Sequence, residues 1–508
     1  MSKLVKRANR KNGPLVPVIS LILFVSTLCF TSAKWYVDAY GDIGFDAVLY
    51  TLTANLGGVE KGIIFNYIKD ALLYAVVFSG ILSAALFFPF RKQVVMILFG
   101  HKKLRIYPMP KLVSSLVCVL LSCAMIVQAA ENVKLGEYIE SMQNPSTFYQ
   151  DHYADPDELT IRFPEDKRNL IYIFLESVET TFFSEEQGGA LPYNIIPELY
   201  QLAEENVNFS DNEGIGGFSS LTGTTWTIGA MVSQTSGVPL KNLPREDENE
   251  LGEDGSILPN ITALSDILKE NGYYQCLMLG SEAEFGGRQQ YFSGHGVDRI
   301  YDYHTAIADG IIPEDYYVWW GMEDEYLFAY ARQELAEIAD REEPFAFTML
   351  TVDTHRYDGY VCRRCGSDYE KQYENVNACS SRQVYEFVEW IKQQDFYENT
   401  TIVIAGDHLT MDGIYISENV DPSYSRHVYN CFINPFATAQ STQNRRFCAL
   451  DMFPTTLGAM GCIIEGERLG LGTNLFSDKP TWIEELGYEF FQQETAAFSR
   501  YYMEKFEG

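Results

Sequence analysis

Three long apolar stretches near the N-terminus constrain the fold of this chain more than any other feature. They cover roughly residues 15–32, 71–90 and 112–130. Each approaches the ~20 residues that an α-helix needs to cross a bilayer, and helices satisfy their backbone polar groups internally in lipid. The sequence therefore predicts a transmembrane region over residues 1–131 with about three spans. A signal peptide is the alternative for the first stretch, but a clean small-residue cleavage site is lacking and more apolar stretches follow.

Basic residues flank these stretches unevenly. One group precedes the first stretch and another lies between the second and the third, whereas the segment between the first and the second holds few. The two groups are Lys3, Lys6, Arg7, Arg10 and Lys11, and Arg91, Lys92, Lys102, Lys103 and Arg105. Because basic loops stay in the cytoplasm, a multi-pass membrane protein is expected, with everything after about residue 131 on the extracytoplasmic side.

The charge of the chain separates an aqueous part from this membrane part. The 508 residues include 38 Lys and Arg against 69 Asp and Glu, a net charge of -31, and the acidic residues lie almost wholly after the apolar stretches. This balance argues against nucleic acid as a partner, because phosphate backbones require a basic surface. We expect a linker at 132–165, a folded domain at 166–480 and a helical tail at 481–508.

Continuous apolar runs in the aqueous part predict buried strands. They lie at residues 170–175, 345–352 and 401–405, and a helical pattern at 380–394 separates the last two. Strands that are apolar throughout are typical of central parallel strands, and their alternation with helices predicts an α/β fold with a mainly parallel sheet.

Each of the three runs ends in ionisable residues. Glu176 and Ser177 follow the first, Asp353-Thr354-His355 the second and Asp407-His408 the third. Carboxyl ends of parallel strands meet at the crevice where open α/β sheets bind ligands. We therefore expect these carboxylates and imidazoles to form one site, with Asp407 and His408 as half of a metal site.

A segment rich in Gly, Ser and Thr at 214–229 supplies candidate nucleophiles. It leads into a short apolar helix, predicted at 228–235 and ended by Gly237. A hydroxyl at the N-terminus of such a helix benefits from the helix dipole and from unpaired backbone N–H groups. The alternative for this segment is a Thr that only caps the helix.

Together these motifs resemble the alkaline-phosphatase/sulfatase superfamily, and more closely its membrane phosphoglycerol transferases, the glucan phosphoglycerol transferases and lipoteichoic acid synthases. The resemblance covers residues 168–476 and implies a sulfatase-like three-layer domain. It rests on Phe174-Leu-Glu176-Ser177, the Thr-rich turn, Phe285-Gly-Gly-Arg288, Asp353-Thr-His355, Gly406-Asp407-His408 and Asp451-Met-Phe-Pro-Thr455.

The resemblance also implies roles for single residues. Glu176, Asp407, His408 and the nucleophilic Thr match metal ligands, His355 a substrate-contacting catalytic residue, and Arg288 a phosphate- or glycerol-binding group. The nucleophile of the superfamily lies ten residues before a helix-ending Gly, which indicates Thr227, with Thr224 and Thr225 as alternatives. Hard oxygen ligands with one imidazole favour Mn²⁺, or else Mg²⁺.

The implied activity is the transfer of glycerophosphate from phosphatidylglycerol to a cell-envelope glycan or polyol through a phospho-threonine intermediate. The implied location is the bacterial inner membrane, where the spans would hold the domain beside its lipid donor. The alternatives are a phosphoethanolamine transferase of the same superfamily and a non-catalytic membrane sensor with this fold.

Some residues depart from the superfamily pattern. The lipoteichoic acid synthases have a His where this chain has Leu279, and the Cys-x-Pro-x-Arg motif of sulfatases is absent, so sulfate ester hydrolysis is not expected. Cys362, Cys365 and Cys379 resemble the glucan branch. Zinc binding is disfavoured because no second Cys-x-x-Cys or His pair exists, and we predict a disulfide among the three cysteines.

Overall fold

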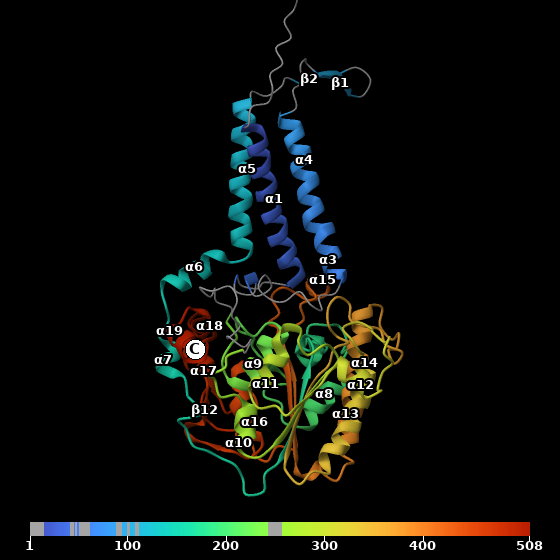
Figure 1. Ribbon diagram of the computed structural model, residues 1–508, viewed down its shortest axis with the longest axis vertical. Coiled ribbons are helices and arrows are strands. Elements are labelled where there is room, and N and C mark those ends of the chain that lie inside the picture. Colours follow the sequence, from blue (N-terminus) through green and yellow to red (C-terminus); the bar gives the residue numbers. More distant parts are fainter. Residues whose placement is uncertain are drawn as a thin grey trace, which may run out of the picture. The chain divides into compact units, whose positions relative to one another are not determined.

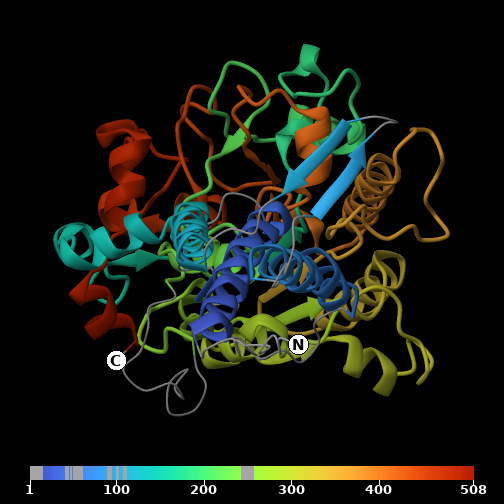
Figure 2. The same ribbon diagram turned by 90° about the horizontal axis from the view of Figure 1, so that it is seen from above.

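The protein is described by a computed structural model covering residues 15–40, 45, 48–49, 61–87, 94–98, 102–106, 111–241 and 257–507. The chain divides into two compact units. The first contains residues 1–42 and 59–136, and the second contains 43–58 and 137–508. Figure 1 labels their helices and strands, and Figure 2 views the long N-terminal helices nearly end-on.

The N-terminal unit contains three apolar helical stretches that are long enough to cross a membrane, at Leu15–Ala39, Ile64–Ala85 and Leu112–Asn132. They belong to α1 (Leu15–Tyr40), to the continuous run of α3 (Lys61–Tyr67), a π-helical turn (Ile68–Leu72) and α4 (Leu73–Phe87), and to α5 (Lys111–Asn132). Large apolar side chains such as Leu112, Ile81 and Leu15 are exposed on them. Such surfaces suit a lipid environment better than water.

The second stretch begins earlier than the sequence indicated. Its helical run continues N-terminal to Ala71, the predicted start, through Lys69 and Asp70. These two exposed side chains form an ion pair of 3.7 Å on the helix. Between α4 and α5, β1 (Val94–Leu98) and β2 (Lys102–Ile106) form an antiparallel hairpin. Most of the basic residues used to orient the chain lie outside the described residues.

The second unit is built on a seven-stranded sheet in the order β5-β10-β9-β4-β8-β6-β7. The predicted strands are its three central neighbours, β9 (Thr400–Gly406), β4 (Asn169–Leu175) and β8 (Phe345–Leu350). They run parallel, as do β6 (Tyr274–Leu279) and β7 (Arg299–Tyr301), whereas β10 (Val428–Ile433) is antiparallel to both β9 and β5 (Gly217–Phe218). The mainly parallel α/β fold is confirmed.

Side chains of β4 alternate between two hydrophobic cores, one on each face of the sheet. Leu170, Tyr172 and Phe174 belong to the first core, and Ile171 and Ile173 to the second. The first core is closed by α9 (Thr227–Ser236), α10 (Leu264–Glu270), α11 (Arg288–Gly294) and α16 (Met452–Ala459). The second is closed by α8 (Pro197–Glu205), α12 (Tyr303–Ala308), α13 (Asp324–Ala339), α14 (Gln372–Ile391) and α15 (Gly413–Asn419). The domain is therefore three-layered, as predicted.

The segments before and after the sheet pack against each other. In α7 (Phe148–His152), Phe148 contacts Trp482 of α17 (Trp482–Leu486) and Phe491 of α18 (Tyr488–Ala496). Further elements include α6 (Leu135–Gln143), α19 (Arg500–Tyr502), a π-helical turn (Met503–Glu507) and the short strands β3 (Ile161–Arg162), β11 (Ile463–Ile464), β12 (Arg468–Leu469) and β13 (Gly472–Thr473). The boundaries at 131, 165 and 480 stay predictions.

Candidate functional site

Glu176, Asp407 and His408 meet where β4 and β9 end. Leu175 of β4 pairs with Gly406 of β9, so the residues that follow both strands are neighbours. His408 Nε2 lies 3.3 Å from Asp407 Oδ2 and 3.7 Å from Glu176 Oε1, and all three side chains are buried. A Cβ on Gly406 would lie 2.1 Å from the carbonyl oxygen of Val178, so this close approach of two strand ends requires glycine.

Thr227 joins this group from another element. It is the first residue of α9, and its Oγ1 lies 3.4 Å from Glu176 Oε2 and 3.5 Å from His408 Nε2. The helix cap is Trp226, without a side-chain capping bond, so the alternative of a Thr that only caps the helix is wrong for Thr227.

The two competing threonines have other surroundings. Thr224 Oγ1 donates to the carbonyl of Leu221 and accepts from its N–H, while Thr225 Oγ1 is buried without a hydrogen-bond partner among the described residues. Of the three threonines, Thr227 is therefore the one with hydrogen bonds to Glu176 and His408.

Gln234, which the sequence did not single out, fastens α9 to the end of β9. Its Nε2 donates to the carbonyls of Gly406 at 3.0 Å and Asp407 at 3.1 Å, and its Oε1 accepts from the Tyr172 hydroxyl at 2.9 Å. Gln234 lies two turns after Thr227 and so on the same face of the helix. The sequence signal for Gln234 was a long amide side chain in a helix whose other residues are short or apolar.

The protonation pattern of the site suits a bound cation. His408 Nδ1 lies 2.8 Å from the Leu409 carbonyl, which can only accept, so Nδ1 carries the proton and Nε2 presents its lone pair to the carboxylates. Burial raises the pKa of Asp407 to about 7, and burial together with the charge of Asp407 raises the pKa of Glu176 to about 7. Asp407 Oδ2 has no hydrogen-bond partner among the described residues.

A divalent metal ion fits this donor set. Glu176, Asp407 and His408 each offer one ligand atom within 4.8 Å of the others. Metal-bound histidines commonly donate their second N–H to a carbonyl, as His408 does to Leu409. A cation would also satisfy the unpaired carboxylate oxygen and the imidazole lone pair at once, so the chain has a possible metal site at these three residues.

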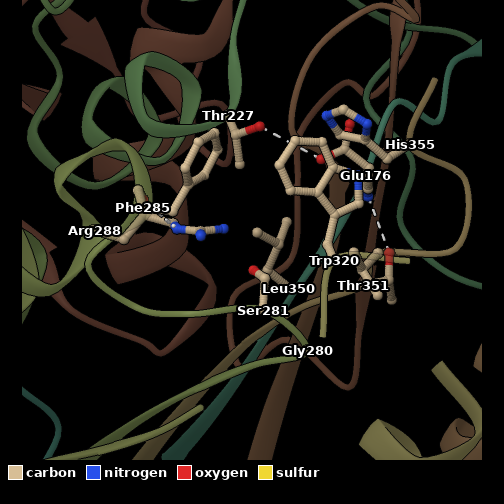
Figure 3. A pocket seen from close by; sticks show the side chains of 11 residues that line it. Glu176, Thr227, Gly280, Ser281, Phe285, Arg288, Trp320, Leu350, Thr351 and His355 are labelled. Carbon is tan, nitrogen blue, oxygen red and sulfur yellow. Dashed lines mark hydrogen bonds between the residues drawn. The ribbon is translucent and has the colours of Figure 1, made fainter. Parts of the chain in front are cut away.

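A cleft continues from these residues toward Arg288 and His355. Figure 3 shows Thr227 with its hydroxyl toward Glu176, Arg288 beside Phe285 on one side, and Trp320 and His355 on the other. The buried Arg288 donates through Nε to the carbonyl of Phe285 at 2.9 Å and through Nη2 to that of Glu282 at 2.8 Å. Its guanidinium thus places positive charge in the wall of the cleft.

His355 is held as a neutral imidazole. Its Nδ1 lies 2.9 Å from the carbonyl of Arg356, and its ring packs edge-on against Trp320. Burial, followed by the charge of Arg356, lowers the pKa of His355 to about 3. Nε2 therefore remains an acceptor at neutral pH. Trp320 was not predicted as a site residue, although the aromatic run at 316–320 could have drawn attention to it.

All six residues predicted for the site lie around this cleft or next to it. Glu176, Thr227, Arg288 and His355 line it, and Asp407 and His408 adjoin Glu176. The family model Sulfatase matches residues 168–462, more than half of the chain. The chain belongs to the sulfatase family.

Relatives within the family include enzymes named phosphoglycerol transferase I. The one from Citrobacter koseri is 28% identical over 408 residues, which cover 78% of this chain and 48% of the relative. The one from Xanthomonas euvesicatoria pv. vesicatoria is 34% identical over 251 residues, covering 48% of this chain and 34% of the relative. The chain thus spans about half the length, or less, of these curated relatives.

Solved structures of related folds are more distant in sequence. The lipoteichoic acid synthase LtaP from Listeria monocytogenes has a TM-score of 0.48 at 17% identity, covering 63% of this chain and 79% of that one. The lipooligosaccharide phosphoethanolamine transferase A from Neisseria meningitidis has a TM-score of 0.47 at 15% identity, covering 88% of this chain and 84% of that one.

Proposed function

We propose that this chain is a metal-dependent phosphotransferase that moves glycerophosphate from phosphatidylglycerol to an envelope glycan or polyol through phospho-Thr227. The observation that carries the proposal is the position of Thr227 Oγ1, 3.4 Å from Glu176 Oε2 and 3.5 Å from His408 Nε2. The similarity to enzymes named phosphoglycerol transferase I supports the choice of the transferred group.

Thr227 begins and ends the reaction as a free hydroxyl. In the first half, its Oγ1 forms a bond to phosphorus, the bond from phosphorus to the diacylglycerol oxygen breaks, and diacylglycerol leaves with the proton. In the second half, an acceptor hydroxyl forms the new phosphorus–oxygen bond and the proton returns to Thr227. The position of Thr227 at the start of α9 favours an anionic phosphate nearby, because helix N-termini carry partial positive charge.

Glu176, Thr227, Asp407 and His408 would hold the metal ion, for which we propose Mn²⁺ or else Mg²⁺. When bound, such an ion lowers the pKa of a coordinated hydroxyl and so activates it as a nucleophile. The positions of these residues depend on Gln234 and on the close contact at Gly406.

Arg288 and His355 would bind the two substrates. The guanidinium of Arg288 is always charged and suits a phosphate oxygen. The neutral His355, with Nδ1 engaged by the Arg356 carbonyl, can accept a hydrogen bond at Nε2 from the hydroxyl that attacks or leaves. The proposal therefore gives His355 a catalytic as well as a substrate-binding role.

The three apolar helices would keep the enzyme at the membrane that contains its donor. We propose a multi-pass protein of the bacterial inner membrane with its catalytic domain on the extracytoplasmic side, on the basis of the basic residues that flank the helices. The domain limits 132–165, 166–480 and 481–508 belong to the same proposal.

Headgroup transfer from labelled lipid tests the proposal directly. The full chain in detergent is given phosphatidylglycerol labelled in its glycerol headgroup, and diacylglycerol release and labelled acceptors are measured by mass. We expect release by the wild type, a glycerophosphate adduct on the peptide that contains Thr227, and loss of both in Thr227→Ala. Thr225→Ala is the matched control, because its hydroxyl makes no hydrogen bond with the described residues.

Other outcomes would contradict the proposal in distinct ways. Normal diacylglycerol release by Thr227→Ala would remove Thr227 as the nucleophile. Faster headgroup release from phosphatidylethanolamine would identify a phosphoethanolamine transferase instead. If neither lipid releases diacylglycerol with any of the acceptors tested, the result would favour a non-catalytic membrane sensor.

A further inference from the structure

Cys362, Cys365 and Cys379 converge on one point outside the cleft. Cys362 and Cys365 lie in the segment between β8 and α14, and Cys379 lies on α14. The Sγ atom of Cys362 is 3.7 Å from that of Cys365 and 3.7 Å from that of Cys379, and the three sulfur atoms lie within 4.8 Å of one another. All three are free thiols, so the predicted disulfide among them is not formed in the structure.

The separation of the sulfur atoms suits a shared metal ion. Zinc binds thiolate sulfur at about 2.3 Å, and a tetrahedron with bonds of that length has edges of about 3.8 Å. The bonded sulfur atoms of a disulfide are only about 2.0 Å apart. Cys362 stands at nearly the tetrahedral edge distance from both partners.

The surroundings of the cluster include a hydrogen-bond donor to sulfur. The Gln383 amide donates to Cys379 Sγ at 3.6 Å. Such donors to sulfur stabilise the negative charge that a metal ligand carries.

Exposure distinguishes one side of the cluster. Cys362 and Cys379 are buried, whereas Cys365 is partly exposed. A water molecule can therefore reach the cluster from this side and serve as a fourth ligand. The sequence argument against zinc required a second Cys-x-x-Cys or a His pair, whereas in the structure the third thiol comes from Cys379 on α14.

We propose that Cys362, Cys365 and Cys379 bind a zinc ion as three thiolates, with water as the fourth ligand, and that this ion fastens the segment following His355 to α14. Soft thiolates select zinc over the hard cations expected at Glu176 and Asp407. The same segment is held at its start, where Tyr360 N–H donates to the Asp353 carbonyl at 2.7 Å. The role is structural and does not depend on the proposed phosphotransferase activity.

X-ray absorption at the zinc edge tests the proposal on the full chain purified in detergent without chelator. All variants also carry His408→Ala, so that metal bound at the cleft does not add to the measured zinc content. We expect one zinc ion per chain with about three sulfur neighbours at about 2.3 Å. Cys379→Ser should lower the zinc content at least tenfold. Cys431→Ser is the matched control, since Cys431 is a buried thiol on β10, and it should retain the zinc.

Three results would overturn the proposal. The first is zinc with only oxygen and nitrogen neighbours, and the second is equal zinc content in Cys379→Ser and wild type. The third is a disulfide among the three cysteines, seen by mass as two thiols that resist alkylation until reduction. If Cys379→Ser fails to fold, two measurements on protein with all three cysteines intact still test the proposal. They are the zinc absorption spectrum and the alkylation of the thiols.

Discussion

The Nε2 atom of His408 lies 3.3 Å from Oδ2 of Asp407, although neither atom has a proton to share when the imidazole is neutral and the carboxyl is ionised. The arrangement is stable with a cation between the two ligand atoms or with an added proton. Because burial lowers the pKa of His408, protonation of the imidazole is disfavoured. Burial raises the pKa of Asp407 to about 7, so the added proton resides on the carboxyl, and a bound cation competes with it.

Asp407→Asn should weaken Mn²⁺ binding by more than about 100-fold. Loss of the residues that only support metal ligands already costs about 10–100-fold in affinity, and this change removes a charged ligand itself. Isothermal titration of the metal-free full chain with Mn²⁺ measures the effect. Asp421→Asn is the control, because Asp421 is an exposed carboxylate that accepts hydrogen bonds from the N–H and the hydroxyl of Ser423. Equal Mn²⁺ affinity in Asp407→Asn and wild type would refute the ligand assignment.

His355 should make the protein less stable in mild acid. Its folded-state pKa of about 3 lies below the value of about 6.5 in an unfolded chain, so below pH 6.5 the unfolded state binds the extra proton. The free energy of unfolding should therefore decrease as the pH falls from 6.5 toward 3. In His355→Gln this contribution disappears, and the midpoint of thermal unfolding should depend less steeply on pH over that window.

His304→Gln is the matched comparison for this pH effect. The His304 side chain is 65% exposed, so its replacement should leave the slope of the unfolding midpoint against pH unchanged. Wild type and His355→Gln with identical slopes between pH 4 and 6.5 would show that His355 is not held neutral.

The sequence was sufficient for the fold and for the strand-end residues because both follow from local patterns. A strand buried on both faces must be apolar throughout, so β4, β8 and β9 were visible as continuous runs, and their ends located Glu176, His355, Asp407 and His408. Parallel pairing of neighbouring strands then brings these ends together without further information.

Other parts of the site depend on contacts between distant segments. Thr224, Thr225 and Thr227 have the same chemistry, and only the start of α9 and its docking by Gln234 separate them. The position of Trp320 in the cleft likewise depends on how loops pack, which no local pattern encodes.

Gln234→Leu should both destabilise the protein and slow turnover. The change leaves the Gly406 and Asp407 carbonyls without these donors and the Tyr172 hydroxyl without this acceptor, and each buried group left unpaired costs about 1–3 kcal/mol. Thermal unfolding and kcat of headgroup release measure the two effects. Tyr172→Phe removes one of these bonds and should lower stability by only about 1 kcal/mol with little change in kcat. Wild-type kcat in Gln234→Leu would show that Gln234 does not position Asp407.

The fully buried Glu179 depends on Arg426, which donates to it through Nε at 2.8 Å and through Nη2. Glu179 also accepts from the N–H of Thr410, two residues after His408, so the ion pair supports the loop that follows the metal ligands.

Arg426→Ala should lower the free energy of unfolding by about 3–5 kcal/mol, because it leaves a buried charge without its partner. Arg426→Lys keeps the charge but loses the bidentate geometry, and should fall between alanine and wild type. Arg341→Ala, which breaks an exposed pair with Glu343, should leave the unfolding midpoint unchanged. Similar unfolding midpoints for Arg426→Ala and Arg341→Ala would mean that solvent reaches Glu179 and that the loop after His408 does not rely on this pair.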